Sequence, residues 1–283
     1  MDEPFVSVVV TVRNEAGAIT ELLESLAVQE PPYEVLVVDS NSEDGTREIV
    51  ASFAAKHPTI RLLLHGNTRG GSRNFGVARA GGDIVAFVDG DCLASPSWVA
   101  EIREAMATAD VVAGRTVNIG YEPFTRLERV ELSHKGFDVT YPSCNLAYRR
   151  DVFESLGGFD PHFRTAEDID LNFRAVEHGY SIAFAPKAVV YNRTRSRVVG
   201  FLKQAFWNGY GRKQLTLKHG NLWASYSFRK LFARQMTFWG VVRLACAVLG
   251  YLTCKVREPR RPYVPPPALV TPRARPQAEE KGA

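Results

Sequence analysis

Two carboxylates separated by one glycine, Asp89 and Asp91, directly follow an apolar run at residues 84–88. On extended backbone, side chains two residues apart point to the same side, and Gly90 lets a ligand approach the main chain closely. Two like charges at that spacing repel each other unless a cation lies between them. Because hard divalent cations take oxygen ligands, the pattern predicts a Mn²⁺ or Mg²⁺ site that holds a diphosphate. A polar turn that closes a core strand would show the same residues.

The elements around this pair predict how it is positioned. Apolar, β-branched runs at 7–12, 34–38, 60–64 and 84–88 indicate strands, and helical spacing of apolar residues separates them. This alternation predicts an α/β fold with a mostly parallel twisted sheet and helices on both faces. Ligands of such sheets bind beyond the carboxyl ends of the strands. Polar residues stand at three of these ends, so we expect them to share one crevice: Thr11, Asp39 and the pair Asp89/Asp91.

Asp39 and Arg73 each have two readings. Asp39 either caps the following helix or accepts hydrogen bonds from a base or a ribose. Arg73 is expected in the first turn of a helix at 72–80, where backbone N–H groups and the helix dipole favour anions; it could also be a solvated helix residue. Neither GxxxxGK[ST] nor GxGxxG occurs in the sequence, which argues against a P-loop NTPase and a dinucleotide-binding dehydrogenase.

A second acidic pair, Glu167 and Asp168, opens a helix expected to run to residue 178. Acids in the first turn of a helix are stabilised by its dipole, which is one explanation for the pair. The other is a general base at a loop-to-helix junction, placed to take a proton from an attacking hydroxyl. Local sequence does not decide between them.

Composition sets the limits of the molecule. The 283 residues, 45% of them hydrophobic, are enough for one large domain with or without an appendage. The four cysteines show no CxxC spacing, so a zinc site or a disulfide framework is not expected and a reducing compartment fits better. Acidic residues at the amino terminus are unlike the basic n-region of a signal peptide, so we expect no export signal.

Taken together, these segments resemble glycosyltransferase family 2, the inverting class with the GT-A fold. The similarity covers about residues 5–192, and the resemblance implies a GT-A glycosyltransferase domain at 1–192. Six blocks occur in the order typical of the family: SVVVTVRNE at 7–15, VLVVDSNSEDGT at 35–46, NTRGGSRNFGVARAGGDIVAFVDGDC at 67–92, NLAYRRDVF at 145–153, GGFDPHF at 157–163 and EDIDLNFRAVEHGYSIAFAPKAVV at 167–190.

The resemblance implies a binding site for a nucleotide-diphospho-sugar. Thr11, Arg13 and Asp39 would hold its base and ribose, with Arg73 nearby. Arg13 stands where an aromatic residue is frequent in the family, and Cys92 stands where a third acid is common. These departures bear on the identity of the base, for which we expect uridine and hence a UDP-sugar.

The resemblance also implies the catalytic groups. Asp89 and Asp91 would form the DxD pair, with Asp91 as the direct ligand of Mn²⁺ or Mg²⁺. Asp168 would be the base that deprotonates the acceptor hydroxyl while it attacks the anomeric carbon from the face opposite the leaving group. A single displacement of this kind inverts the configuration of the sugar.

Residues 193–256 lie beyond the clear resemblance and form a basic, aromatic-rich segment that we expect to be helical. Residues 193–261 hold fifteen Lys and Arg against one acid, a net charge of +14, whereas residues 1–192 carry −11. This split predicts that the rear of the chain faces an anionic partner. Within it, Trp207 and Arg212 are candidates, together with Glu167, for contact with the acceptor or the diphosphate. A helix that only packs on the sheet is the alternative.

The most apolar stretch is residues 237–254, interrupted by Arg243. As a helix it would be roughly 27 Å long, barely the thickness of the hydrocarbon layer. Basic residues on both flanks and the central arginine favour an interfacial helix on an anionic cytoplasmic leaflet. A spanning helix and a soluble packing helix are the alternatives. We therefore expect peripheral or monotopic association with the cytoplasmic face of the cell membrane, with a single span left open, and a disordered Pro-rich tail at 257–283.

The sequence thus predicts an inverting, metal-dependent glycosyltransferase that moves a sugar from a nucleotide-diphospho-sugar to a hydroxyl acceptor, lipid-linked or part of a surface glycan. A nucleotidyltransferase is the rival enzyme, but its glycine-rich loop is missing after the first strand. A non-catalytic, membrane-tethered module that binds nucleotide or glycan is the other alternative, and the acids at 89, 91 and 168 argue against it. Nucleic acid is not an expected partner, because an acidic main domain repels phosphate.

Overall fold

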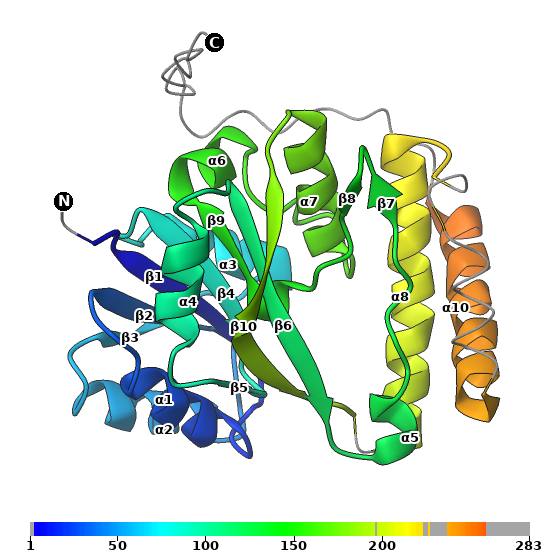
Figure 1. Cartoon of the computed structure of the whole chain (residues 1–283). Coiled ribbons are helices and arrows are strands. Elements are labelled where there is room, and N and C mark those ends of the chain that lie inside the picture. Colours follow the sequence, from blue (N-terminus) through cyan, green and yellow to red (C-terminus); the bar gives the residue numbers. More distant parts are fainter. Residues whose placement is uncertain (1–2, 196, 223–225, 227–236, 259–283) are drawn as a thin grey trace, which may run out of the picture.

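The computed structural model describes residues 3–195, 197–222, 226 and 237–258. Within that part of the chain, eight strands form one twisted sheet in the order β3-β2-β1-β4-β9-β6-β10-β5, beside a small hairpin, β7-β8 (Figure 1). The strands are β1 (Val6–Val12), β2 (Tyr33–Asp39), β3 (Ile60–Leu64), β4 (Ile84–Asp89), β5 (Cys92–Ala94), β6 (Val111–Ile119), β7 (Ser133–His134), β8 (Phe137–Asp138), β9 (Leu146–Arg149) and β10 (Ile182–Arg193).

The register of the central strands brings the predicted polar residues to one edge. β1 pairs in parallel with both β2 and β4, which places Val12 beside Asp39 and Thr11 beside Asp89. β9 lies between β4 and β6 and is antiparallel to both, and β10 continues the sheet parallel to β6. The expected α/β, mostly parallel sheet is confirmed, with β9 and β5 as its antiparallel members in the described residues.

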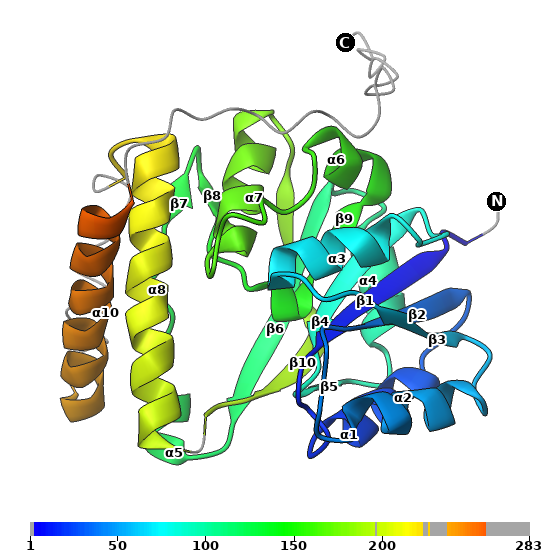
Figure 2. The same ribbon diagram turned by 180° about the vertical axis from the view of Figure 1, so that it is seen from behind.

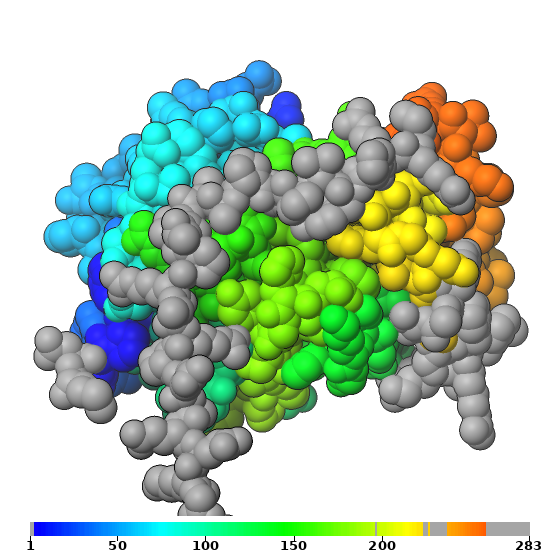
Figure 3. Space-filling view, turned by 90° about the horizontal axis from the view of Figure 1, so that it is seen from above, coloured from blue at the N-terminus to red at the C-terminus, as the bar shows by residue number. Residues whose placement is uncertain are grey.

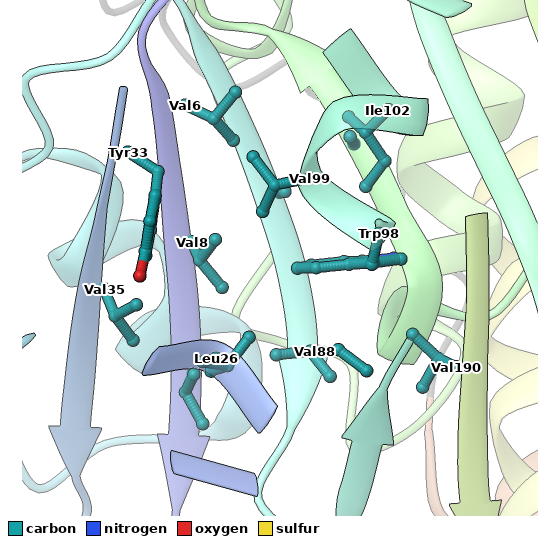
Figure 4. Packing of buried hydrophobic residues seen from close by; sticks show 14 of the residues in the cluster. Val6, Val8, Leu26, Tyr33, Val35, Val88, Trp98, Val99, Ile102 and Val190 are labelled. Carbon is teal, nitrogen blue, oxygen red and sulfur yellow. The ribbon is translucent and has the colours of Figure 1, made fainter. Parts of the chain in front are cut away.

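Helices cover both faces of the sheet, as Figures 1 and 2 show from opposite sides. α1 (Ile19–Ala27), α2 (Thr46–Ala54) and α4 (Trp98–Ala105) pack on one face, and Figure 4 shows Leu26 and Trp98 against valines of the central strands. α3 (Arg69–Val77), α6 (Arg150–Ser155) and α7 (Glu167–Glu177) pack on the other face. Since β1, β2 and β4 are buried on both faces, they read in sequence as continuous apolar runs rather than alternating ones.

Helix α3 begins earlier than the expected 72–80. Thr68 is its N-cap, because its hydroxyl oxygen accepts a hydrogen bond from the backbone N–H of Gly71 at 3.2 Å. The two glycines that suggested a loop instead lie in the first turn, packed too closely on neighbouring side chains for a Cβ to fit without a shift. Arg69 is therefore the first helical residue, and Arg73 lies one turn further along than predicted.

The rear of the described chain consists of two long helices, α8 (Val198–His219) and α10 (Phe238–Arg257), with the short α5 (Glu122–Thr125) at one end. They form one flank of the molecule, coloured yellow and orange in Figure 3. The two helices run side by side in the same direction: the rings of Phe201 and Trp239 meet near their starts, and Gln214 donates to Glu258 near their ends. Residues 257 and 258 are described, and the rest of the predicted tail lies outside the described residues.

Candidate active site

A cavity of about 1430 Å³ lies beyond the carboxyl ends of β1 and β4 and extends between the sheet and the helices α7, α8 and α10. It is larger than a typical pocket for one small ligand. Most of the residues that the sequence singles out line it: Thr11, Arg13, Asp89, Asp91, Glu167, Asp168 and Arg212. Three others, Asp39, Arg73 and Trp207, lie outside its lining.

Arg73, just outside the lining of the cavity, links the two acidic pairs through one member of each. Its Nη2 donates to Asp89 Oδ1 at 2.6 Å and its Nη1 to Glu167 Oε1 at 2.7 Å, while its guanidinium lies 5.3 Å from the centre of the Phe159 ring. Burial alone would raise the pKa of Asp89, but Arg73 and then Arg69 more than offset it and hold that pKa below its usual value. Asp89 is therefore an ionised carboxylate with one oxygen already engaged.

Asp91 and Glu15 both line the open side of the site, and both have raised pKa values. Burial, followed by the nearby Asp89 carboxylate, raises the pKa of Asp91. Burial and then Asp91 and Asp89 raise the pKa of Glu15 to about 7. Arg195 Nη1 lies 4.0 Å from Asp91 Oδ2 and lowers both pKa values in part. Sequence reasoning missed Glu15, although it ends the block at 7–15 that contains the first strand.

Arg69 is a second residue that sequence reasoning missed. It lines the cavity from the first turn of α3, and the carboxylate of Asp89, followed by those of Glu167 and Asp168, raises its pKa. The cation that the sequence expected at a helix N-terminus facing an anion is thus Arg69, with Arg73 buried behind it. The signal was available: Thr68 is a good N-cap residue, and recognising it would have moved the helix start.

Asp39 is fully buried at the end of β2. Its Oδ1 accepts from Arg47 Nη2 and from the backbone N–H of Ser42, each at 3.1 Å. Its Oδ2 is buried and has no hydrogen-bond partner among the described residues, which is costly for a carboxylate oxygen. The next residue, Ser40, lines the cavity. The reading of Asp39 as a helix cap is wrong, because the N-cap of α2 is Gly45 and no side chain caps that helix. Asp39 instead organises the turn before α2 and keeps one oxygen without a partner, and its contact with a base or ribose stays a prediction.

Asp168 lies in the first turn of α7 and lines the cavity half-buried. Its Oδ2 accepts from the backbone N–H of Ser143 at 3.0 Å and lies 3.4 Å from the hydroxyl of the same residue. The residue before the pair, Ala166, has φ +66°, a left-handed conformation that is strained for a side chain with a Cβ. This turn directs Glu167 into the buried ion pair with Arg73 and leaves Asp168 facing the cavity.

The three residues proposed for acceptor or diphosphate contact have different surroundings. Glu167 is buried against Arg73, and burial followed by the Asp168 charge raises its pKa, so a positioning role explains it better than direct contact. Trp207 packs under the guanidinium of Arg164 at 4.6 Å and does not line the cavity, so the structure gives its proposed contact no support. Arg212 lines the cavity and donates to the carbonyl oxygen of Val130 at 2.7 Å.

A divalent cation has no protein cage in this site: no group of three or more His, Cys, Asp or Glu side chains is arranged to enclose one in the described part of the chain. Mg²⁺, however, commonly binds one or two carboxylates and completes its shell with water and substrate phosphate. Asp91 fits that role, because its carboxylate lines the cavity and is partly exposed. Asp89, with one oxygen held by Arg73, can supply the second carboxylate.

Comparison with known proteins agrees with this geometry. The model of glycosyl transferase family 2 matches residues 7–157, and that of glycosyl transferase family group 2 matches residues 84–258. Glycosyltransferase AglE of Haloferax volcanii is 32% identical over 272 residues, which is 90% of this chain and 86% of AglE. The chain belongs to glycosyltransferase family 2. It is therefore a glycosyltransferase that uses a nucleotide sugar.

Other known proteins are similar over part of their length. The pre-mycofactocin glycosyltransferase of Mycobacterium tuberculosis is 29% identical over 76% of this chain, which spans about half (48%) of that protein. Among solved structures, the mannosyltransferase PcManGT from Pyrobaculum calidifontis, in complex with GDP-Man and Mn²⁺, has a TM-score of 0.62 at 21% identity over 91% of this chain and 77% of its own. TarS of S. aureus in complex with UDP has a TM-score of 0.54 at 24% identity over 73% and 64%. These neighbours establish the GT-A-type fold.

Proposed function

We propose that this family 2 glycosyltransferase is inverting and metal-dependent, and that it transfers a sugar to a hydroxyl of a lipid-linked or surface-glycan acceptor at the cytoplasmic face of the cell membrane. One observation supports this most directly. A single cavity holds the carboxylate pair Asp89/Asp91 at a strand end and the carboxylate of Asp168 on the facing helix. In this proposal the first pair would bind the leaving nucleotide and Asp168 would activate the attacking hydroxyl, both within one space.

The donor would lie over the carboxyl ends of β1, β2 and β4. Thr11 and Arg13 line that part of the cavity, and Asp39 keeps a buried oxygen for a base or ribose donor. PcManGT and TarS have been solved with GDP-Man and UDP respectively, so both bases occur on this fold. We keep a UDP-sugar as the proposed donor.

The transfer would proceed as one displacement. Asp168 takes the proton of the acceptor hydroxyl while the acceptor oxygen forms a bond to the anomeric carbon, and the bond from that carbon to the diphosphate oxygen breaks. The electron pair leaves with the nucleoside diphosphate. Arg69 and Arg195 face the position where this charge collects, and fixed cations aimed at developing charge lower the barrier.

Mn²⁺ or Mg²⁺ would be held by Asp91, with Asp89 beside it. Bound there, it would supply Lewis-acid neutralisation of the diphosphate. The Mn²⁺ in the PcManGT structure supports a divalent cation on this fold. Glu15 has no assigned role in holding it, and its negative charge adds to the potential that attracts a cation.

Membrane association would come from α10. Among the helices of the described residues, it is the one long and apolar enough to cross a membrane by length and composition. The relatives include proteins named for surface polysaccharides, such as the O-antigen chain rhamnosyltransferase WbaN of Salmonella anatum, 28% identical over 56% of this chain. Such polymers support an acceptor held at a membrane. The strongly basic rear of the chain supports the anionic cytoplasmic leaflet as the surface.

A screen of nucleotide sugars tests the donor and metal assignments. Each sugar nucleotide would be assayed for hydrolysis and for thermal stabilisation of the protein, with Mn²⁺, with Mg²⁺ and with a chelator. We expect one class of donor to be hydrolysed slowly, and the chelator to abolish the activity. Equal turnover in chelator and in Mn²⁺ would refute the metal dependence, and absence of turnover with every donor would refute the proposed donor class.

The variant Asp168→Asn tests the base. We expect kcat to fall by about 10²–10⁴-fold, because the attacking hydroxyl loses its proton acceptor. Donor and Mn²⁺ affinities should stay within a few-fold, since the substituted group faces the acceptor. Asp151→Asn, an exposed first-turn acid of α6 outside the cavity lining, is the matched control. Near-normal transfer by Asp168→Asn would show that another group is the base.

A further inference from the structure

The side of α10 that faces away from the protein is a continuous apolar surface. From residue 238 to residue 252, every exposed position on the helix carries an apolar side chain. Its large members recur at helical spacing, and we call this set the outer face: Phe238, Val241, Leu244, Val248, Leu249, Leu252 and Val256. Phe238 and Val256, at its two ends, are 73% and 86% exposed. An apolar stripe of this length on a soluble surface marks a site of contact with something else.

Arg243 does not interrupt the outer face. In the sequence it stands in the middle of the apolar stretch, but in the structure it turns to the opposite side of the helix. There it lines the cavity, and its Nη2 donates to the carbonyl oxygen of Glu128 at 2.7 Å. Basic residues lie at the edge instead: Lys255 and Arg257 are exposed in the last turn of α10, and Lys203 is exposed on α8. This is the charge pattern that an anionic lipid surface attracts.

The pairing with α8 excludes a simple crossing of the membrane by α10. Gly209 and Gly250 let the helices touch: a Cβ on Gly209 would lie 1.8 Å from the Ala247 carbonyl oxygen, and one on Gly250 would lie 1.9 Å from that of Phe206. The other side of α8 lines the cavity with polar groups, among them Gln204, Asn208 and Arg212. If α10 spanned the bilayer, this polar cavity would be carried into hydrocarbon, where unsolvated polar groups are costly.

We propose that α10 lies in the plane of the leaflet, with its outer face in lipid and α8 between it and the sheet. Leu244 and Val248 belong both to the outer face and to the lining of the cavity, so the lipid-facing surface continues into the site. An acceptor with an apolar tail then enters sideways from the leaflet, its tail along α10 and its hydroxyl toward Asp168. The route of entry rests on the proposed transfer to a lipid-linked acceptor; the orientation of α10 stands without it.

Site-directed fluorescence measures this orientation on the full chain. Single bimane labels would be placed by Phe238→Cys, Val248→Cys and Val256→Cys in a Cys246→Ser background, since the other three native cysteines are buried. Lys56→Cys, exposed just beyond α2 on a different part of the surface, is the control. The labelled proteins are mixed with vesicles of phosphatidylcholine and phosphatidylglycerol, brominated either near the head group or near the chain end, and separately with aqueous iodide. Hydrolysis of the donor nucleotide sugar by each labelled protein reports whether it is folded and active.

If α10 lies in the plane of the leaflet, the three labels on it should lie at equal and shallow depths in the lipid. All three labels on α10 should be quenched several-fold more by lipid brominated near the head group than by iodide, and to the same extent within about twofold. A span would put Val248 near chain-end bromine and the two ends near the interfaces, since the helix is roughly 27 Å between residues 238 and 256. Quenching of the α10 labels by iodide alone, as expected for Lys56→Cys, would show a soluble face. Either of these results overturns the proposal, whereas absent donor turnover with equal shallow quenching would count only against the proposed function.

Discussion

At the scale of residues, the site is a chain of alternating charges: Glu167, Arg73, Asp89 and Arg69 follow one another from the buried side toward the cavity. Removing a partner from a buried ion pair leaves an uncompensated charge, which costs far more than the pair contributes. The alternation therefore fixes where Asp89 and α7 stand relative to each other. Asp91, Asp168 and Arg195 are among the charged groups on the open side that can change partner when substrates bind.

Arg195 is the residue whose assignment changes most between sequence and structure. The sequence counts it with the basic segment that faces a membrane, whereas the structure places its guanidinium beside Asp91. For Arg195→Met we expect kcat to fall by about 10–10²-fold, because the leaving diphosphate loses a cation. We expect Mn²⁺ to bind more tightly, because a competing positive charge is removed from Asp91.

The two expected effects of Arg195→Met, slower turnover and tighter Mn²⁺ binding, have opposite signs. General damage to the site would weaken both functions. Steady-state kinetics gives the first effect and Mn²⁺ titration by electron paramagnetic resonance gives the second. Arg197→Met, two residues along and outside the cavity lining, is the control. Weaker Mn²⁺ binding together with slower turnover would mean that Arg195 only supports the fold of the site.

Glu15 makes the stability of the metal-free protein depend on pH. Its pKa is raised from 4.5 to about 7, so the folded state holds a proton that the unfolded state has lost between these values. Stability therefore falls as pH rises through this range, and the loss is complete above it. Glu15→Gln removes this penalty, so the variant should melt at a higher temperature than the wild type. The difference in melting temperature should grow from pH 5 to pH 7 and then level off at a few degrees.

Melting curves in a chelator check the Glu15 prediction, with Glu24→Gln, an exposed residue of α1, as the control. A difference between Glu15→Gln and the wild type that stays constant from pH 5 to pH 8 would contradict the raised pKa. Adding Mn²⁺ should reduce the difference above pH 7, because the cation offsets the carboxylate charge that the substitution removes.

At the scale of elements, the strands were predictable because a buried parallel strand has a plain signature, a short β-branched run with polar residues at its end. The positions of Thr11, Asp39 and Asp89 at one edge follow from that pattern and from the topology. The start of α3 was not predictable in the same way, because Gly70 and Gly71 suggest a loop in sequence. For Gly70 the reason is tertiary, because a Cβ there would lie 3.1 Å from the Cβ of Phe159, whereas a Cβ on Gly71 would lie 2.6–2.9 Å from the side chain of Asn67, four residues earlier.

The partners of the rear helices were also beyond sequence reasoning. Helical spacing identifies an apolar stretch, but it does not tell which side of the helix Arg243 faces or which helix receives it. The parallel pairing of α8 with α10 depends on Gly209 and Gly250, which lie on separate helices and have no shared pattern in the sequence. The pairing is nevertheless what makes both helices part of the cavity wall.

Gly250→Val tests that pairing. The added atoms would collide with the carbonyl oxygen of Phe206, so the helices must separate, and overpacking of this kind typically costs about 1–3 kcal/mol. We expect a lower melting temperature and a weaker acceptor-dependent rate, with donor hydrolysis largely kept. Ala245→Val, on the exposed side of the same helix, is the matched control. If both variants unfold at the same temperature as the wild type, the close contact of the two helices is not important for stability.

At the scale of the whole molecule, charge is divided between an acidic front and a basic rear, −11 over residues 1–192 and +14 over residues 193–261. An anionic surface attracts one part and repels the other, so the molecule has a preferred orientation before any contact forms. In that orientation the flank made by α8 and α10 would meet an anionic lipid surface first. The sequence predicts this division fully, because it requires only a count of charges along the chain.

Vesicle flotation tests the charge division. We expect strong recovery of the full chain with vesicles that contain phosphatidylglycerol at low salt, since each basic residue near such a surface contributes about 1 kcal/mol. Recovery should fall several-fold in about 1 M salt, where the Debye length shrinks to roughly 3 Å. Some binding should remain in high salt, because the outer face of α10 is apolar and salt does not screen its burial. Lys255→Glu with Arg257→Glu should weaken recovery at low salt only. Equal recovery with neutral and anionic vesicles at every salt concentration would mean that the basic rear does not direct the protein to the membrane.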